Sequence, residues 1–209
     1  MIQNRLDSEG NPPPRCTYSE FLAMCDGRHA EWVDGRIHFM SPASHEHQRL
    51  AAFLCALIEE FQSRAIGGTV IMAPFQMKGG EDLPGREPDL LWISPSREDQ
   101  LRASYLDGPA DLAVEIVSPE SRHRDTVVKR DEYESAGVRE YWVIDVEESV
   151  VRLHVLDRSG RYSERILRAG DELASHGLAG LRLPVRWMLC PANDRPSPVE
   201  AMRELGWVD

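Results

Sequence analysis

A stretch of strand, helix and strand between residues 111 and 151 constrains the fold of this chain more than any other segment. It reads DLAVEIVSPESRHRDTVVKRDEYESAGVREYWVIDVEESVV, with two apolar runs on either side of a charged segment that ends at Gly137. This order predicts strands of a central sheet with a helix packed over them. Glu115 lies inside the first apolar run, where a carboxylate is costly unless it is paired or binds a metal.

Apolar spacing predicts most other elements. We expect helices at residues 18–25, 45–61 and 122–136, and strands at residues 69–77, 90–93, 112–117, 141–145 and 150–156. A hairpin is expected at Glu31–Met40, because Asp34-Gly35 favours a tight turn. Ser44 is the expected N-cap of the second helix, and Pro74 places its strand at a sheet edge or a bulge. The core order is helix, three strands, helix, strand, which predicts a mixed α/β fold.

The length of 209 residues suits one domain with a full core. Residues 1–16 are polar and proline-rich, and we expect them to be a flexible lead-in. The predicted domain covers residues 17–190, and residues 191–209 are left as a C-terminal tail. No internal repeat or long linker divides the domain.

Composition and charge limit the cellular compartments and the classes of binding partner that fit this chain. No apolar run approaches the ~20 residues of a membrane span, and the N-terminus lacks an apolar signal core. Four scattered cysteines without a C-x-x-C pair are typical of a reducing compartment, so we expect a cytoplasmic protein. The net charge of −11 opposes nucleic-acid binding unless the basic residues gather on one face.

Two strand carboxylates and a helix lysine provide the chemistry of a metal-dependent phosphodiesterase. Asp89 heads the apolar run LLWI, and Glu115 lies in the next strand. Mg²⁺ prefers carboxylate and carbonyl oxygens, so these acids and the backbone carbonyl of Ile116 are the candidate metal ligands. Lys129 is the candidate catalytic ammonium. The alternatives are that Asp89 only opens a strand from a turn, that Glu115 forms a purely structural ion pair, and that Lys129 only pairs with Asp125.

The helix that carries Lys129 has two further features. Asp125, Lys129 and Tyr133 are spaced at i, i+4 and i+8 and therefore share one face. The same helix holds the densest basic cluster of the chain, made of Arg122, Arg124, Lys129 and Arg130. We expect this cluster to face phosphate groups, and the alternative is a solvated helix surface.

Three segments together resemble the Uma-type restriction endonuclease family, which belongs to the PD-(D/E)xK nuclease superfamily. They read EWVDGRIHFMSPASH, EPDLLWIS and VEIVSPESRHRDTVVKRDEYESAGVREYWVID, and the resemblance covers roughly residues 18–189. It implies a restriction-endonuclease-like three-layer core with an N-terminal hairpin and C-terminal strands, dependence on Mg²⁺ or Mn²⁺, and DNA as substrate. By position, Asp89 and Glu115 match the metal-binding acids of the superfamily.

The chain departs from the superfamily at one position. The usual lysine lies two residues after the second acid, where this chain has Val117. The family pattern has a helix lysine instead, and Lys129 occupies that position. Glu31 and His45 also match the family pattern. Glu31 is a candidate for a further acid near the metal, His45 could contact phosphate or cap its helix, and Gln76, in the strand before Asp89, could point into the cleft. The alternatives are a hairpin residue for Glu31 and a structural or surface residue for His45.

The sequence therefore predicts a divalent-metal-dependent DNA endonuclease. One alternative is a catalytically lapsed nuclease fold that acts as an interaction module, which the acidic balance and Val117 favour. Another is a hydrolase of small phosphorylated compounds. A homodimer is expected, because two copies of one site are the simplest way to cut both strands. His47 and His123 are expected to be solvated.

Overall fold

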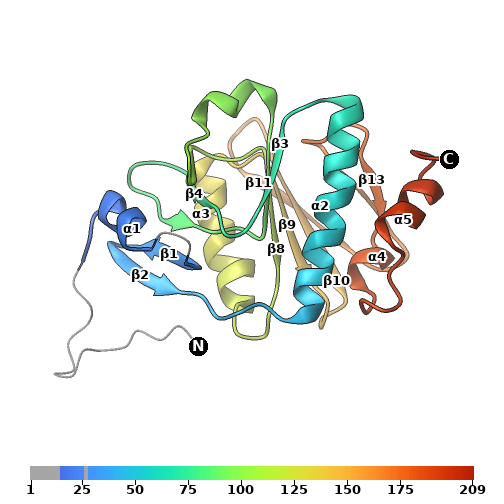
Figure 1. Ribbon diagram of the computed structural model, residues 1–209, viewed down its shortest axis with the longest axis horizontal. Helices are drawn as coiled ribbons and strands as arrows, with labels where there is room; N and C mark the ends of the chain where they lie inside the picture. The colour runs from blue at the N-terminus through green and yellow to red at the C-terminus, as the bar shows by residue number, and fades with distance from the viewer. Residues whose placement is uncertain (1–14, 26–27) are drawn as a thin grey trace.

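A six-stranded sheet forms the centre of the computed structural model, which describes residues 15–25 and 28–209 (Figure 1). Its strand order is β11-β10-β9-β8-β6-β3. The strands are β3 (Thr69–Met72), β6 (Leu90–Ile93), β8 (Leu112–Ile116), β9 (Glu140–Asp145), β10 (Val150–Leu156) and β11 (Tyr162–Leu167). β8 and β9 are parallel, and the other neighbours pair antiparallel.

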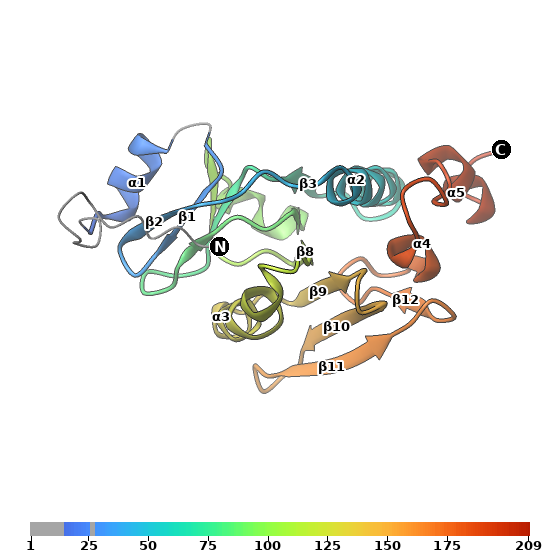
Figure 2. The same ribbon diagram turned by 90° about the horizontal axis from the view of Figure 1, so that it is seen from below.

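Helices cover both faces of this sheet (Figure 2). One face carries α2 (His45–Ala65), and the other carries α3 (Lys129–Ala136), which continues a π-helical turn η2 (Arg124–Val128). The elements α2, β3, β6, β8, α3 and β9 follow the expected order, so the predicted mixed α/β core is confirmed. Ser44 caps α2 by accepting the N–H of His47 at 3.2 Å, and α3 ends at Gly137 with φ 84°.

A second sheet of five strands lies beside the first, in the order β2-β1-β5-β4-β7. The strands are β1 (Ala30–Val33), β2 (Arg36–Phe39), β4 (Gln76–Lys78), β5 (Gly85–Arg86) and β7 (Tyr105–Asp107). β1 and β2 form the predicted hairpin, with positive φ at Asp34 and Gly35 in its turn. Phe21 of α1 (Tyr18–Met24) packs against one side of it.

The prediction of one strand over residues 69–77 is wrong. Residues 69–72 form β3 at the edge of the large sheet, whereas residues 76–78 form β4 in the small sheet. Pro74 lies between them and has no N–H to continue a ladder. The chain therefore leaves one sheet and enters the other at this point.

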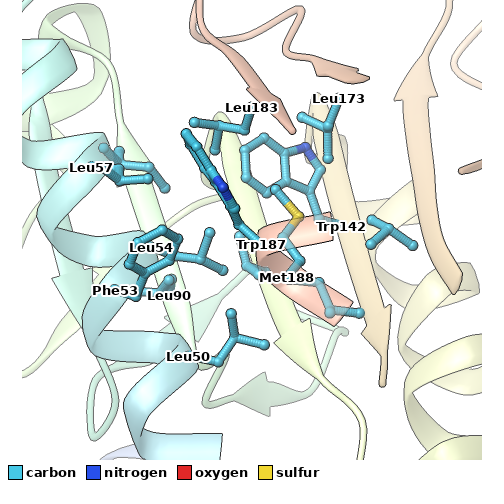
Figure 3. Packing of buried hydrophobic residues seen from close by; sticks show 14 of the residues in the cluster. Leu50, Phe53, Leu54, Leu57, Leu90, Trp142, Leu173, Leu183, Trp187 and Met188 are labelled. Carbon is cyan, nitrogen blue, oxygen red and sulfur yellow. The ribbon is translucent and has the colours of Figure 1, made fainter. Parts of the chain in front are cut away.

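The main core lies between α2 and the large sheet (Figure 3). Leu50, Leu54 and Leu57 of α2 are buried in the same cluster as Trp142 of β9. Trp187 closes this cluster from α4 (Arg186–Leu189), and β12 (Glu172–Ala174) and β13 (Arg182–Pro184) add a small two-stranded sheet. A 3₁₀ turn, η1 (Pro95–Gln100), follows β6.

The residues assigned to a C-terminal tail pack onto the domain. They include α5 (Pro198–Glu204), which contacts α2, and Ala201 is fully buried. The rings of Phe61 and Trp207 lie 5.6 Å apart. A domain boundary at residue 190 would thus cut through a packed layer. The predicted lead-in, residues 1–16, lies outside the described residues except for Arg15 and Cys16. Within the described ranges, no helix combines the length and the apolar character needed to span a membrane.

Candidate active site

Asp89 immediately precedes β6 and lies opposite Glu115 of the neighbouring strand β8. β6 and β8 pair antiparallel, and their register, continued by one residue, sets Asp89 against Glu115. Asp89 Oδ2 accepts the backbone N–H of Ile116 at 2.7 Å and lies 3.0 Å from His47 Nε2. The two predicted acids therefore occupy the same end of this strand pair.

The ammonium group of Lys129 is buried among carboxylates from three elements. Its Nζ lies 2.6 Å from Glu115 Oε1, 2.9 Å from Glu31 Oε1 and 3.8 Å from Asp125 Oδ1. Tyr133 donates its hydroxyl to the same oxygen of Glu115 at 2.9 Å. The residues at i, i+4 and i+8 thus form the helix face that meets Glu115.

Arg86 joins the hairpin to α3 and was not anticipated from the sequence. Its guanidinium donates to Glu31 Oε2 at 2.7 Å and to both carboxylate oxygens of Glu132 at 2.6 and 2.7 Å. Burial raises the pKa of Glu31, but the charges of Lys129 and Arg86 outweigh it and lower the pKa to about 2. Glu31 is therefore a permanently ionised acid that ties the hairpin to the helix.

Glu115 is the strained acid of the cluster. Burial raises its pKa well above the usual range, Lys129 opposes this effect, and the carboxylates of Asp125 and Asp89 raise it further. Burial lowers the pKa of Lys129, but the carboxylates of Glu115, Glu31 and Asp125 outweigh it, so the ammonium stays charged. Three carboxylates surround the Lys129 ammonium, and Asp89 lies opposite Glu115, so negative charge exceeds positive charge at this end of the strand pair and favours a bound cation.

The donor set fits a hard divalent ion that keeps most of its waters. Glu115 Oε2 and Asp89 Oδ1 accept no hydrogen bond from the described part of the chain, whereas their partner oxygens do. No three His, Cys, Asp or Glu side chains in residues 15–25 and 28–209 are grouped to enclose a metal. Mg²⁺ commonly uses one or two carboxylates, with water and substrate phosphate as further ligands. A closed structural metal site does not fit these residues.

Comparison with known proteins places the chain in a family. The model of the Uma2 family, described as "Putative restriction endonuclease", matches residues 18–186. The chain belongs to the Uma2 family. A crystal structure described as a putative nuclease belonging to DUF820, from Anabaena variabilis ATCC 29413, matches with a TM-score of 0.70. The match covers 85% of this chain and 98% of that chain at 16% identity, and it shows the shared fold. A search of curated proteins finds no match.

The histidine beside the acids of this Uma2-family chain is His47, not His45. His45 has a side chain that is 75% exposed, and the structure does not bring it to the acid pair. The prediction that His47 is solvated is wrong, because its side chain is 17% exposed and bonded to Asp89. The helical spacing of the sequence indicates this position, since His47 shares a helix face with Leu50 and Leu54, which are buried.

Gln76 lies in a separate polar cluster that borders the acids. Its side-chain amide donates to the carbonyl of Ala30 at 2.6 Å and to Glu87 Oε2 at 3.0 Å. The other Glu87 oxygen lies 2.6 Å from His29 Nδ1. The backbone N–H of Glu87 donates to Glu31 Oε1 at 3.4 Å, so Gln76 borders the site of the Uma2-family chain through Glu87 and through Ala30, the residue before Glu31.

The predicted basic cluster is largely neutralised within the molecule. Arg122 binds Asp145 at 2.7 Å and Glu147 at 2.6 Å. Arg130 pairs with Asp131, and Lys129 is buried, so the prediction that it faces phosphate from the surface is wrong. Arg124 Nε lies 3.5 Å from Asp125 Oδ1 and has no hydrogen-bond partner among the described residues. Asp125 is buried and its Oδ1 is similarly unbonded within those residues.

Proposed function

We propose that this chain is a Mg²⁺- or Mn²⁺-dependent endonuclease that hydrolyses phosphodiester bonds of DNA. The observation that carries the proposal is the placement of Asp89 opposite Glu115, with the Lys129 ammonium 2.6 Å from Glu115. Membership of the Uma2 family and the fold of a putative nuclease support the same reaction class. Four free cysteines support the reducing cytoplasm as its compartment.

Each group has a distinct role in this proposal. Asp89, Glu115 and the carbonyl of Ile116 would hold the metal, which when bound activates water and neutralises developing charge on the phosphate. Lys129 keeps its proton at Nζ and fixes Glu115 Oε1, which leaves Oε2 for the metal. Tyr133 donates to the same oxygen and restricts the carboxylate further. Lys129 thus takes the place of the lysine that Val117 does not supply.

The first test is Mn²⁺ binding by isothermal titration calorimetry, followed by cleavage of supercoiled plasmid with Mg²⁺ or Mn²⁺. We expect the double variant Asp89→Ala/Glu115→Ala to lose both binding and cleavage. The matched control is Glu172→Gln, because Glu172 is an exposed acid that pairs with Arg182 at 2.6 Å. Cleavage by the double variant at the wild-type rate, or no cleavage by wild type on any DNA form, contradicts the proposal.

A second candidate is a catalytically lapsed module that uses the fold for interaction. It is favoured by the way in which Lys129 and Tyr133 already bind Glu115, and by the net charge of −11. This candidate predicts that wild-type protein binds no Mn²⁺ even when a non-cleavable DNA analogue is present. The same titration therefore separates the two candidates.

We propose a homodimer as the form that acts on duplex DNA. Two copies of a site related by a two-fold axis can cut both strands, which one copy must do sequentially. Sedimentation equilibrium of wild type, with and without a short duplex, tests this. A monomer in both conditions that still makes double-strand breaks in one encounter contradicts it.

A further inference from the structure

The first turns of α2 carry different residues on their two flanks. His47 turns toward the acid pair, where its Nε2 lies 3.0 Å from Asp89 Oδ2. Arg49 follows two residues later, which places its side chain about 200° further around the helix axis. Arg49 therefore lies on the flank of α2 opposite His47, and its side chain is exposed.

The chain that follows α4 runs along this second flank of α2. The backbone N–H of Ala192 donates to Glu46 Oε2 at 2.8 Å, and the guanidinium of Arg195 lies 5.9 Å from the centre of the Phe53 ring. Glu46, Arg49 and Phe53 are spaced at i, i+3 and i+7, so they form one stripe of the helix. Arg195 therefore lies over this stripe, one helical turn from Arg49.

The guanidinium of Arg195 is held by backbone carbonyls and not by a carboxylate. Its Nε donates to the carbonyl of Trp187 at 2.8 Å, and its Nη2 donates to the carbonyl of Cys190 at 2.9 Å. A guanidinium has five N–H donors, so Nη1 keeps both of its own for another acceptor. Arg195 is partly exposed, and neither carbonyl neutralises its charge.

Arg49 also lacks a carboxylate partner, because it forms no ion pair with any acid that the structure describes. Glu46 is the acid on the same stripe, but its Oε2 accepts the N–H of Ala192 and its Oε1 lies 3.9 Å from His45 Nδ1. Two arginines without a carboxylate partner thus lie next to each other on the surface of α2.

We propose that Arg49 and Arg195 together bind a backbone phosphate of DNA beside the acid cluster. Figure 1 shows that α2 begins at the end of the molecule where β8 leads into α3, and that the loop between α4 and α5 reaches the same end. A strand held at Asp89 would cross the first turns of α2, a width of about 10 Å, to reach the two arginines.

This phosphate site rests on the proposed function and names where the strand is held. Arginine donors match phosphate oxygens in geometry and charge. The local potential at two adjacent guanidiniums can be positive on an acidic protein, so the net charge of −11 does not oppose binding here.

The test measures binding without cleavage, by fluorescence anisotropy of a short labelled DNA duplex in Ca²⁺ buffer over a salt series. We expect Arg49→Gln and Arg195→Gln each to weaken binding and to reduce the slope of log K against log salt by about 1. Arg49→Lys keeps the cation and should keep most of the slope. The matched control is Arg165→Gln, because Arg165 is an exposed arginine of β11, likewise without an ion pair among the described residues. It should leave the slope unchanged.

Arg49→Gln decides the outcome, because Arg49 is exposed, whereas Arg195 also braces the chain after α4. A slope for Arg49→Gln that equals those of wild type and control overturns the phosphate site. A wild type that binds no duplex overturns it too, as does Arg49-dependent binding of polyglutamate instead of DNA.

The same data separate the phosphate site from the nuclease proposal. If the Arg49-dependent slope is present while wild type cleaves no DNA, the phosphate site stands and the nuclease proposal fails. If wild type cleaves DNA while the slopes are unchanged, the nuclease proposal stands and the phosphate site fails.

Discussion

Two buried glutamates on neighbouring strands show how surroundings give the same residue different properties. Glu140 Oε2 accepts three hydrogen bonds, from Ser175 Oγ at 3.0 Å and from the N–H groups of His176 at 2.8 Å and Gly177 at 2.6 Å. Its Oε1 accepts the indole N–H of Trp142 at 2.6 Å. Glu115 accepts hydrogen bonds at one oxygen only, from Lys129 at 2.6 Å and Tyr133 at 2.9 Å, while burial and the carboxylates of Asp125 and Asp89 raise its pKa, so its charge is less well accommodated.

This contrast predicts unequal effects of the same substitution on stability. Glu115→Gln keeps an oxygen that accepts from Lys129 and Tyr133 and removes a carboxylate that burial and neighbouring acids disfavour, so we expect the free energy of unfolding to change by no more than about 1 kcal/mol. Glu140→Gln replaces an acceptor oxygen by an amide that faces N–H donors, and we expect a loss of at least about 2 kcal/mol. Chemical denaturation measures both. Equal destabilisation by the two variants would contradict the assignment of strain to Glu115.

The raised pKa of Glu115 also predicts pH-dependent metal binding. The pKa of Glu115 is higher in the folded state than in the unfolded chain. Protonated Glu115 therefore stabilises the fold at pH values below its ordinary pKa of 4.5, and this stabilisation is lost as the pH rises through the folded-state pKa. A metal must displace the same proton, so Mn²⁺ affinity should rise with pH by up to about tenfold per unit until Glu115 is ionised. Calorimetry over a pH series tests this, and a flat profile in wild type refutes it.

His47 is expected to position Asp89 for the metal. Loss of a side chain that orients a ligand typically lowers metal affinity by about 10- to 100-fold, and we expect this of His47→Ala. His47→Gln should retain much of the affinity, because its amide keeps a donor near Asp89 Oδ2. The control is His45→Ala, two residues away and exposed. Titration of the three variants with Mn²⁺ tests this prediction. Equal Mn²⁺ affinities would show that His47 does not position Asp89.

The two acids and Lys129 were predictable as residues, whereas the parts played by His47 and Arg86 were not recognised. Asp89 and Glu115 stand out because charge interrupts apolar runs, and Lys129 follows from helical spacing on the next element. His47 was predictable from the same spacing but was overshadowed by the more prominent His45. Arg86 gave no local signal, because β5 is only two residues long, its neighbours in sequence are turn residues, and its role arises from tertiary contacts with Glu31 and Glu132.

At the scale of elements, strand length decided what could be predicted. The strands of the large sheet are four to seven residues long, and the apolar runs of most of them were recognisable. β5 has two residues and β4 has three, too few to show alternation. The small sheet was therefore recognised only by its hairpin, although it supplies Glu31 to the site.

The ion pairs of Arg86 with Glu31 and Glu132 connect the β1–β2 hairpin to α3. We expect the stability of the hairpin to depend on them. Arg86→Met leaves Glu31 and Glu132 without their guanidinium, and we expect about 3–5 kcal/mol of destabilisation. Arg182→Met breaks an exposed ion pair and should cost at most about 1 kcal/mol. Hydrogen exchange should show early loss of protection in β1 and β2 for the first variant. Unchanged protection there would mean that packing on α1 alone holds the hairpin.

At the scale of the whole molecule, the layered core was predictable and its boundary was not. Two long helices and four apolar strands suffice to indicate a covered sheet, because each must bury a face. Residues 191–209 contain no long apolar run, and their packing depends on Ala201 and Trp207 meeting α2. A short amphipathic segment of this kind cannot be distinguished from a tail until its partner surface is known.

Lys129 gives the molecule a resident counterion. Its ammonium already sits among Glu31, Glu115 and Asp125, so the acids are preassembled before any ion arrives from solution. Metal-dependent folding, as in small zinc domains, is therefore not expected. Chelation with EDTA should abolish metal binding while shifting Tm by no more than about 2 °C. Lys129→Met should reverse this pattern, with a low Tm that added Mn²⁺ partly restores as a substitute cation.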